Sequence, residues 1–167
     1  MQIKEKFVHD PSVVFEYTDA DNFDDLDPAL CKQSYGICFC DNKLLIVFGY
    51  FAGKEDEWGF PGGRIEKSET FEDALKREIK EESNMEVLSF LPIGYQKGSK
   101  IGQSDFAYQL RYACKVRPYG EFVSDPAGGV IKAIKLVDPA DYKRYVHNWG
   151  KIGDRSVERA LSLLPKL

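Results

Sequence analysis

The sequence predicts an α+β fold in which a mixed β-sheet is combined with a few helices. Short segments of alternating apolar and aromatic residues recur along most of the chain. An amphipathic helix with clear start and end signals lies among them, near residues 70–84. No internal repeat and no linker divides the 167 residues, so we predict one domain covering residues 1–167.

Strand-like segments in the first third of the chain cover residues 12–17, 32–40 and 44–50. The segment 44–50 is the longest apolar run, which is typical of a buried strand. Between the second and third segments, Asp41-Asn42-Lys43 has the composition of a tight turn. We therefore expect residues 32–50 to form a β-hairpin.

Three further strands are predicted after the amphipathic helix, at residues 85–95, 105–116 and 130–137. The Gly/Ser/Lys-rich segment 96–103 separates the first two and is expected to be a loop. Residues 117–129 are rich in turn-forming residues. This order mixes strands and helices along the chain.

Two helices are predicted near the C-terminus. Asp138 and Pro139 suit the N-cap and first position of a helix that reaches about Tyr145. A last helix is expected over residues 154–164, and its apolar side consists of Val157, Ala160, Leu161 and Leu164.

The helix near residues 70–84 carries acids where a helix ordinarily buries hydrocarbon. At about 100° per residue its apolar stripe consists of Phe71, Ala74, Leu75 and Ile79. Glu78 and Glu82 project into that same sector, and Glu81 lies at its edge. A wet surface is the ordinary explanation of an acid-rich helix, but this angular arrangement argues against it.

Glu78 and Glu82 are also like charges at i and i+4, which repel each other in a helix. A cation between them would offset this repulsion. Carboxylates without a nearby His or Cys form an all-oxygen ligand set, which suits Mg²⁺ or Mn²⁺ better than zinc. Arg77 can offset part of the charge by pairing with Asp73 or Glu81 at helical spacing.

The approach to this helix fits a ligand site. Pro61-Gly62-Gly63 predicts a turn whose backbone can come close to a metal or a phosphate. Thr70 is the expected N-cap, with Asp73 at the third helical position, where a carboxylate complements the helix dipole.

This segment resembles the Nudix box, the signature of the Nudix hydrolases. The matching positions are Gly63, Glu69, Arg77, Glu78, Ile79, Glu81, Glu82 and Met85. Asn84 stands where the family usually has glycine. Asn tolerates a left-handed backbone better than most residues, so we expect the helix to end there in the usual way.

The resemblance implies an α/β/α sandwich with a mixed sheet, and hydrolysis of a pyrophosphate bond in a nucleoside diphosphate linked to another group. It implies that Glu78, Glu81 and Glu82 bind Mg²⁺, or Mn²⁺ in its place, with a carbonyl of Gly62 or Gly63 as a further ligand. Glu81 or Glu82 is alternatively the base that activates water. Glu69 is implied as a supporting acid and Arg77 as the residue that holds the carboxylates in place.

The sequence says less about substrate recognition. Either Trp58 and Phe60, beside the glycine turn, or Phe106, Tyr108 and Tyr112, on one face of a strand, could stack on a base, although core packing is the commoner role. A further set of basic residues, Lys97, Lys100 and Arg111, could hold phosphates. An acid outside the box is a further possibility, for which Glu121 and Asp125 are the nearest candidates.

Composition limits the classes of function. With 27 acids against 23 bases the chain has no basic field, so a small nucleotide-type partner is favoured over nucleic acid. No segment has the length of a membrane span or the character of a signal peptide, which predicts a cytoplasmic protein without membrane contact. The four cysteines, Cys31, Cys38, Cys40 and Cys114, are expected to be free thiols, and the acidic run 19–27 a solvated loop.

Two other functions stay open at this point. One is a non-catalytic Nudix-like sensor that binds a nucleotide, which Asn84 alone favours. The other is an isoprenoid diphosphate isomerase, which would need a catalytic cysteine and histidine ligands that His9 and His147 do not supply. The sequence leaves a homodimer open as well.

Overall fold

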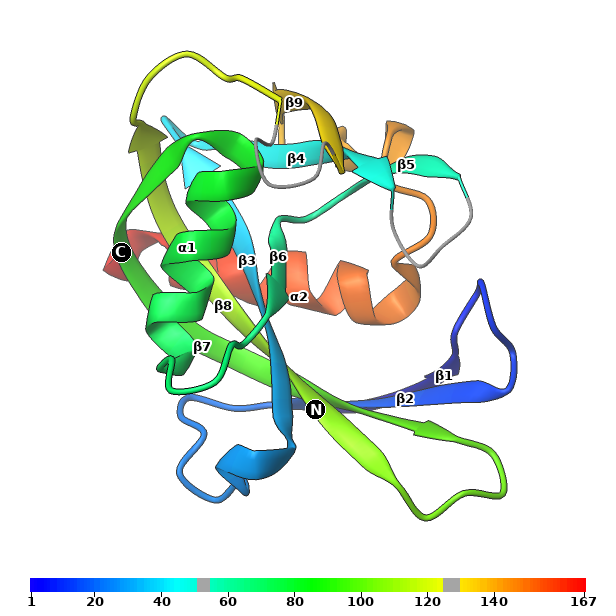
Figure 1. Cartoon of the computed structure of the whole chain (residues 1–167). Helices are drawn as coiled ribbons and strands as arrows, with labels where there is room; N and C mark the ends of the chain where they lie inside the picture. The colour runs from blue at the N-terminus through cyan, green and yellow to red at the C-terminus, as the bar shows by residue number, and fades with distance from the viewer. Residues whose placement is uncertain (51–54, 125–129) are drawn as a thin grey trace.

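The computed structural model describes residues 1–50, 55–124 and 130–167. Figure 1 shows a twisted sheet with one long helix on each side, so the α/β/α sandwich is confirmed. The strands are β1 Gln2–Lys6, β2 Val13–Asp19, β3 Cys31–Cys40, β4 Lys43–Tyr50, β5 Asp56–Gly59, β6 Gly62–Arg64, β7 Met85–Lys100, β8 Phe106–Pro118 and β9 Ile131–Val137. The helices are α1 Phe71–Ser83 and α2 Gly150–Leu163, with short 3-10 turns at Pro28–Leu30, Tyr142–Arg144 and Leu164–Lys166.

The sheet is mixed, as predicted. Its strand order is β1-β2-β7-β8-β3-β4-β5, with β3 and β8 parallel and the other pairs antiparallel. β4 pairs with β3 only at its start, through Phe39–Leu44 and Cys40–Lys43, and β5 pairs with its later residues. β9 pairs with β4 from Leu44 to Gly49. The short strand β6 pairs with β3 at residues 33–35. This divergence of β3 and β4 leaves room for a glycine-rich strand next to α1.

The two faces of the sheet carry separate cores because side chains alternate along each strand. On β3, Ile37 and Phe39 pack into the cluster that contains Val157 and Ala160 of α2. Cys38 and Cys40 pack on the other face with Leu75 and Ile79 of α1. All four cysteines are buried and free, which confirms the expectation of free thiols.

The predicted hairpin is confirmed. Asp41 and Asn42 have φ angles of 47° and 62°, so both occupy the left-handed region that a two-residue turn between twisted strands requires. The strands predicted at residues 12–17, 32–40, 44–50, 85–95, 105–116 and 130–137 are all present, with ends that shift by a few residues.

Three predictions in the second half of the chain are wrong. Residues 96–100 extend β7 instead of starting a loop, because they pair with β2 on one side and β8 on the other. The helix expected after Asp138 is only a 3-10 turn at Tyr142–Arg144, since Asp138 Oδ1 accepts from the Ala140 N–H and the backbone makes i→i+3 bonds. Leu161 of α2 is 37% exposed, outside the apolar contact.

Tertiary contacts also move two boundaries that the sequence did not show. α2 begins at Gly150, four residues before the predicted start, because both oxygens of Glu5 accept from N–H groups of Lys151 and Ile152 at 3.0 and 3.1 Å. Asp19, expected in a solvated loop, instead ends β2, and its side chain is 9% exposed. No helix in the described part of the chain has the length and apolar character of a membrane span.

Candidate active site

The helix that carries the acids begins and ends where its capping residues predict. Thr70 Oγ1 accepts from the Asp73 N–H at 3.1 Å, and α1 starts at the next residue, Phe71. Asn84 closes the helix with φ 53° and ψ 34°, which confirms the left-handed end. Its side chain donates to the Glu121 carbonyl at 2.7 Å, a bond that glycine could not make.

The unusual placement of the acids on α1 is confirmed. Leu75 and Ile79 are fully buried, and Glu82 beside them is only 9% exposed. The Glu78 side chain is 14% exposed, whereas that of Glu81 is 39% exposed. Two of the three carboxylates therefore lie in the sector that packs against the sheet.

Two glycines of β6 allow these carboxylates to approach the backbone. The Gly62 N–H donates to Glu82 Oε2 at 2.8 Å, and the φ of 147° at Gly62 disfavours any side chain there. A β-carbon on Gly63 would lie 2.5 Å from the Glu78 carboxyl carbon. Gly62 and Gly63 belong to a short strand and not to the predicted turn. The strand is fixed by pairing with Ser34 and Tyr35 of β3.

Arg77 is the centre of a group that we call the box cluster, defined as Arg77, Glu69, Glu78 and Glu81. Its guanidinium makes a two-bond contact with Glu69, at 2.7 and 2.9 Å, and also donates to the Arg64 carbonyl. The Nη1 atom donates to Glu78 at 2.8 Å and to Glu81 at 3.2 Å. One guanidinium thus faces three carboxylates.

Burial and charge act differently on two members of the box cluster. Burial raises the pKa of Glu78, and the nearby Glu81 and Glu69 add to this effect, although the bond from Arg77 opposes it. The bond from Arg77 lowers the pKa of Glu69. The folded protein therefore disfavours the ionised form of Glu78 unless a further positive charge is present.

Glu78, Glu81 and Glu82 offer only carboxylate oxygens, and their negative charge exceeds the positive charge of Arg77. Such donors suit a hard divalent cation. Within residues 1–50, 55–124 and 130–167, no three His, Cys, Asp or Glu side chains already converge as a ligand set. The contacts explain this: Arg77 binds oxygens of Glu78 and Glu81, and the Gly62 N–H binds one of Glu82. The amide of Gly62 thus faces a carboxylate, and a Gly62 or Gly63 carbonyl as metal ligand stays a prediction.

The predicted substrate residues do not form one group. Trp58 packs against Phe48, with ring centroids 5.2 Å apart, and Phe60 is fully buried in the core on the α2 side. Phe106 and Tyr108 neighbour each other at the start of β8, with ring centroids 5.4 Å apart. Tyr112 lies in the core on the α1 side.

Arg111 is buried and lines a cavity that none of the other predicted substrate residues lines. Its guanidinium lies over the rings of Tyr35 and Trp149, at 4.6 and 4.8 Å from their centroids. The sequence indicates Arg111 as a basic residue within an apolar strand, but nothing in the sequence associates Tyr35 or Trp149 with it. These two aromatic residues come from β3 and from the residue that precedes α2.

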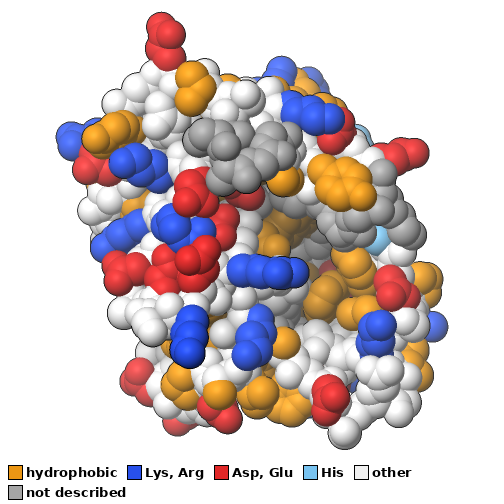
Figure 2. Space-filling view, in the orientation of Figure 1, with side chains coloured by type: hydrophobic (Ala, Val, Ile, Leu, Met, Phe, Trp, Pro, Cys, Tyr) orange, Lys and Arg blue, Asp and Glu red, His pale blue; other side chains and the backbone are white. Residues whose placement is uncertain are grey.

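The candidate acids outside the box are only partly placed. Glu121 lies near the end of α1, where its carbonyl accepts the bond from Asn84. Asp125 lies outside the described residues. In Figure 2 acidic side chains gather on the face that carries α1, and beside them the surface is hollowed, with hydrophobic side chains inside the hollow.

Comparison with known proteins agrees with the fold and the box. A family model described as the NUDIX domain matches residues 32–159. A protein named RNA pyrophosphohydrolase, from a Nitratiruptor species, is 30% identical over an alignment of 100 residues that covers 54% of this chain and 64% of that protein. The match thus spans less than two thirds of the length of that relative.

Solved structures show the same fold at low sequence identity. The Bacillus subtilis pyrophosphohydrolase BsRppH has a TM-score of 0.69 and 19% identity, with 98% of this chain and 96% of that chain covered. A structure described as an ADP compounds hydrolase has a TM-score of 0.59 and 15% identity, with 98% and 92% covered. The family match covers most of the chain and includes the whole box: the chain belongs to the Nudix hydrolase family.

Proposed function

We propose that this protein is a Mg²⁺-dependent hydrolase that cleaves a pyrophosphate bond in a nucleoside diphosphate linked to another group. The observation that supports it best is the box cluster, in which one guanidinium faces three carboxylates beside the buried Glu82. A structural ion pair needs no such excess of acid. Diphosphate chemistry does, because the phosphate oxygens must be neutralised by cations.

Glu78, Glu81 and Glu82 are the residues proposed to hold the metal, which Mn²⁺ can replace. When bound, a divalent ion supplies neutralisation of phosphate oxygens and a lower pKa for a bound water. Arg77 orients Glu78 and Glu81 through its hydrogen bonds, and Glu69 in turn fixes Arg77. The amide of Gly62 orients Glu82. Glu81, the most exposed of the three, is the better placed to accept a proton from water, with Glu82 as the alternative.

Several classes of substrate carry the linkage that the site would cleave. Nucleoside triphosphates, nucleotide sugars and ADP-ribose share the diphosphate that the cluster would bind. The name of the Nitratiruptor relative adds RNA as a candidate. Among RNAs, those with a triphosphate at the 5′ end carry the required linkage, so a panel should include a short 5′-triphosphorylated RNA.

The test is turnover of that panel by the wild type with Mg²⁺, with Mn²⁺ and with a chelator. We expect hydrolysis of at least one member, loss of it on chelation and recovery on adding the metal. Glu82→Gln should lack the activity, which shows that the hydrolysis comes from this protein and not from a contaminating enzyme. Hydrolysis of no member, or equal rates for Glu82→Gln and wild type, would contradict the proposal. Thermal stabilisation by a nucleotide without product would instead favour the nucleotide-binding sensor.

A further inference from the structure

Arg111 on β8 is a buried cation with unused hydrogen-bonding capacity. Only 3% of its surface is exposed, and its Nη2 atom donates to Gln96 Oε1 at 2.9 Å. Its Nε and Nη1 atoms have no hydrogen-bond acceptor among the residues that the structure describes. Since Nε carries one hydrogen and Nη1 carries two, three N–H bonds of this guanidinium await an acceptor.

The aromatic neighbours of Arg111 do not fill this need. Tyr35 and Trp149 stack on the guanidinium and stabilise its charge. Hydrogen bonds of a guanidinium, however, lie in its plane, where rings over its faces cannot accept them. Burial lowers the pKa of Arg111 to about 10, so the side chain is still charged at neutral pH.

The same guanidinium lines a cavity of about 370 Å³, which falls within the range of small-ligand sites. Lys6 also lines it. Aromatic and amide side chains make up most of the remaining wall; they are Phe7, His9, Phe15, Tyr35, His147, Trp149, Gln33, Gln96, Gln109 and Asn148. Two acids also line it, but the Glu5 carboxylate accepts N–H groups at the start of α2, and Glu57 is bonded to His9 and Asn148. Both carboxylates are thus engaged by other donors, and neither serves as an acceptor for Nε or Nη1 of Arg111.

The cavity adjoins the carboxylates of the box. Tyr35, which stacks on Arg111, is paired with Gly62 across β3 and β6. The Gly62 N–H in turn donates to Glu82. Tyr35 thus belongs to the cavity wall and also lies within electrostatic range of Glu82 and Glu78, so the cavity and the acidic face are neighbours. Figure 2 shows a hollow beside the acidic side chains of this face.

We propose that this cavity binds the base of the nucleotide substrate and that Arg111 selects a base with a carbonyl oxygen on its bound edge, such as hypoxanthine or guanine, over adenine. This inference rests on the proposed function for its assumption that the substrate is a nucleotide. The aromatic wall suits a planar ring. Arg111 only donates hydrogen bonds, so it satisfies a carbonyl oxygen or a ring nitrogen but opposes the amino group of adenine.

The test measures binding of inosine and adenosine, which differ at the 6-position, where inosine has a carbonyl and adenosine an amino group. Neither carries a phosphate, so binding reports on the base alone, and the measurement is made with a chelator and without hydrolysis. Trp149 in the cavity wall serves as the fluorescence reporter in a Trp58→Phe background, because the chain has two tryptophans. We expect inosine and guanosine to bind about tenfold or more tightly than adenosine.

Two variants assign the discrimination to Arg111. Arg111→Met keeps the length of the side chain without N–H groups and should bring the two nucleosides to equal affinity. Arg144→Met removes an exposed arginine outside the cavity and should leave the difference intact. A thermal unfolding curve for each variant shows that it is folded before binding is compared.

Several outcomes would overturn the inference. They are equal affinities for inosine and adenosine in wild type, a preference that survives in Arg111→Met, and no binding of any nucleoside. Inorganic pyrophosphate that displaces inosine in an Arg111-dependent way would assign the cavity to an anion instead. None of these measurements involves hydrolysis. The base preference can therefore be absent while metal-dependent turnover is observed, and it can be present while turnover is absent.

Discussion

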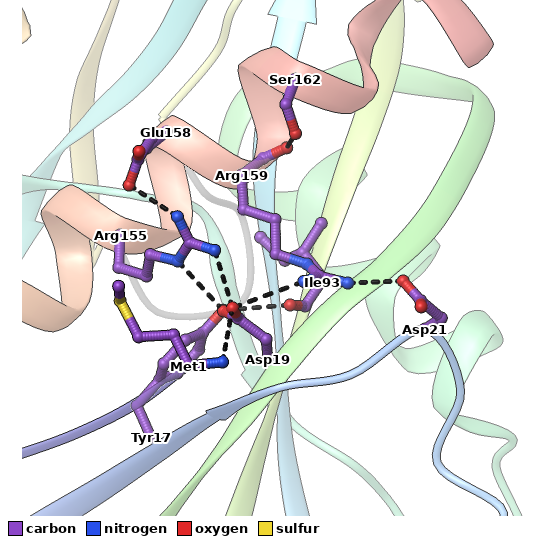
Figure 3. Close-up of polar contacts among 9 residues, drawn as sticks. All are labelled: Met1, Tyr17, Asp19, Asp21, Ile93, Arg155, Glu158, Arg159 and Ser162. Atoms are coloured by element: carbon purple, nitrogen blue, oxygen red, sulfur yellow. Dashed lines mark hydrogen bonds and ion pairs between the residues drawn. The ribbon is translucent and has the colours of Figure 1, made fainter.

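Two groups of arginines and acids in this protein differ in charge balance. In the box cluster one guanidinium, that of Arg77, faces three carboxylates. In the other group the buried carboxylate of Asp19 is paired with two guanidiniums, those of Arg155 and Arg159 on α2, at 2.7 and 3.5 Å. The exposed acids Glu158 and Asp21 pair with the same two arginines. Figure 3 shows the second group converging on Asp19, with the amino group of Met1 as a third positive partner.

The difference between them separates a structural ion pair from a candidate ligand site. Asp19 joins the end of β2 to α2, and its charge is offset within the protein. Burial opposes the ionised form of Asp19, but bonds from Arg155 and the amino group outweigh it, so its pKa falls to about 2. The pKa of Glu78 instead rises on burial, even with Arg77 beside it. The box cluster has one positive group for its three carboxylates, whereas Asp19 has three positive partners. We infer that a bound cation supplies the missing positive charge in the box cluster.

The largest expected effect is on turnover. Glu78→Gln should lower the rate by about 100-fold or more, because the site loses a charged ligand of the proposed metal. The free energy of unfolding should stay the same or rise, since Gln still accepts from Arg77 and relieves the excess of negative charge. Steady-state kinetics and urea unfolding measure the two quantities.

The matched control for this change is Glu158→Gln, the same substitution in the Asp19 group, where the side chain is 69% exposed and pairs with Arg155. It should alter neither turnover nor stability appreciably. A strong loss of stability in Glu78→Gln would show that the box carboxylate is a structural partner of Arg77, and the contrast between the two groups would be lost.

Asp19→Asn should show the reverse pattern. Removal of the buried carboxylate leaves Arg155 and Arg159 with only their exposed partners, Glu158 and Asp21, so we expect a loss of about 2–3 kcal/mol of unfolding free energy. Turnover of the folded protein should change little. Asp21→Asn is the matched control: its side chain is 84% exposed, and the same substitution there should cost less than about 0.5 kcal/mol.

The stability that Asp19 supplies should depend on pH in one direction. Its pKa is depressed in the folded protein, from an ordinary value of 3.8 to about 2, so its contribution is complete above about pH 4. The contribution is lost as pH falls from about 4 through about 2, where the carboxylate becomes protonated. Urea midpoints of wild type and Asp19→Asn should therefore converge over this range, and a constant gap would argue against an ionic role for Asp19.

The smallest effect is expected at the end of α1. Asn84→Gly relieves a left-handed backbone but loses the bond to the Glu121 carbonyl, so stability should change by less than about 1 kcal/mol. Asn84→Ala loses the bond and keeps the unfavourable φ, and should be less stable than Asn84→Gly by about 1 kcal/mol. Equal stability of the two variants would show that the left-handed conformation is not what Asn84 supplies.

The sequence predicted the box well because its determinants are local. Helix periodicity placed Glu78 and Glu82 on the apolar side of α1, and Thr70 and Asn84 placed its two ends. The turn at Asp41 and Asn42 depended only on its own residues and the strands on either side. Such patterns act over a few residues, so a single chain is enough to interpret them.

Prediction failed where partners are distant along the chain. Residues 96–100 have the composition of a loop, yet they lie between two strands that complete their hydrogen bonds. α2 begins at Gly150 because Glu5, more than a hundred residues earlier, accepts from its first amides. Phe60 is near the glycine segment in sequence but lies fully buried in the core. Trp58 packs against Phe48, and its contact with a substrate stays a prediction.

By itself, then, the sequence determined the six longer strands, the two long helices, the acidic face of α1 and the family, since each follows from spacing within a short segment. It did not show the short strands β1, β5 and β6. Only the tertiary structure decided that Arg111 stacks on Tyr35 and Trp149 at the wall of a cavity, and that Asp19 is paired with α2. Burial is the physical reason. A side chain loses its water only when segments far apart in the chain close over it, and its charge or its N–H groups then need a partner that the local sequence does not specify.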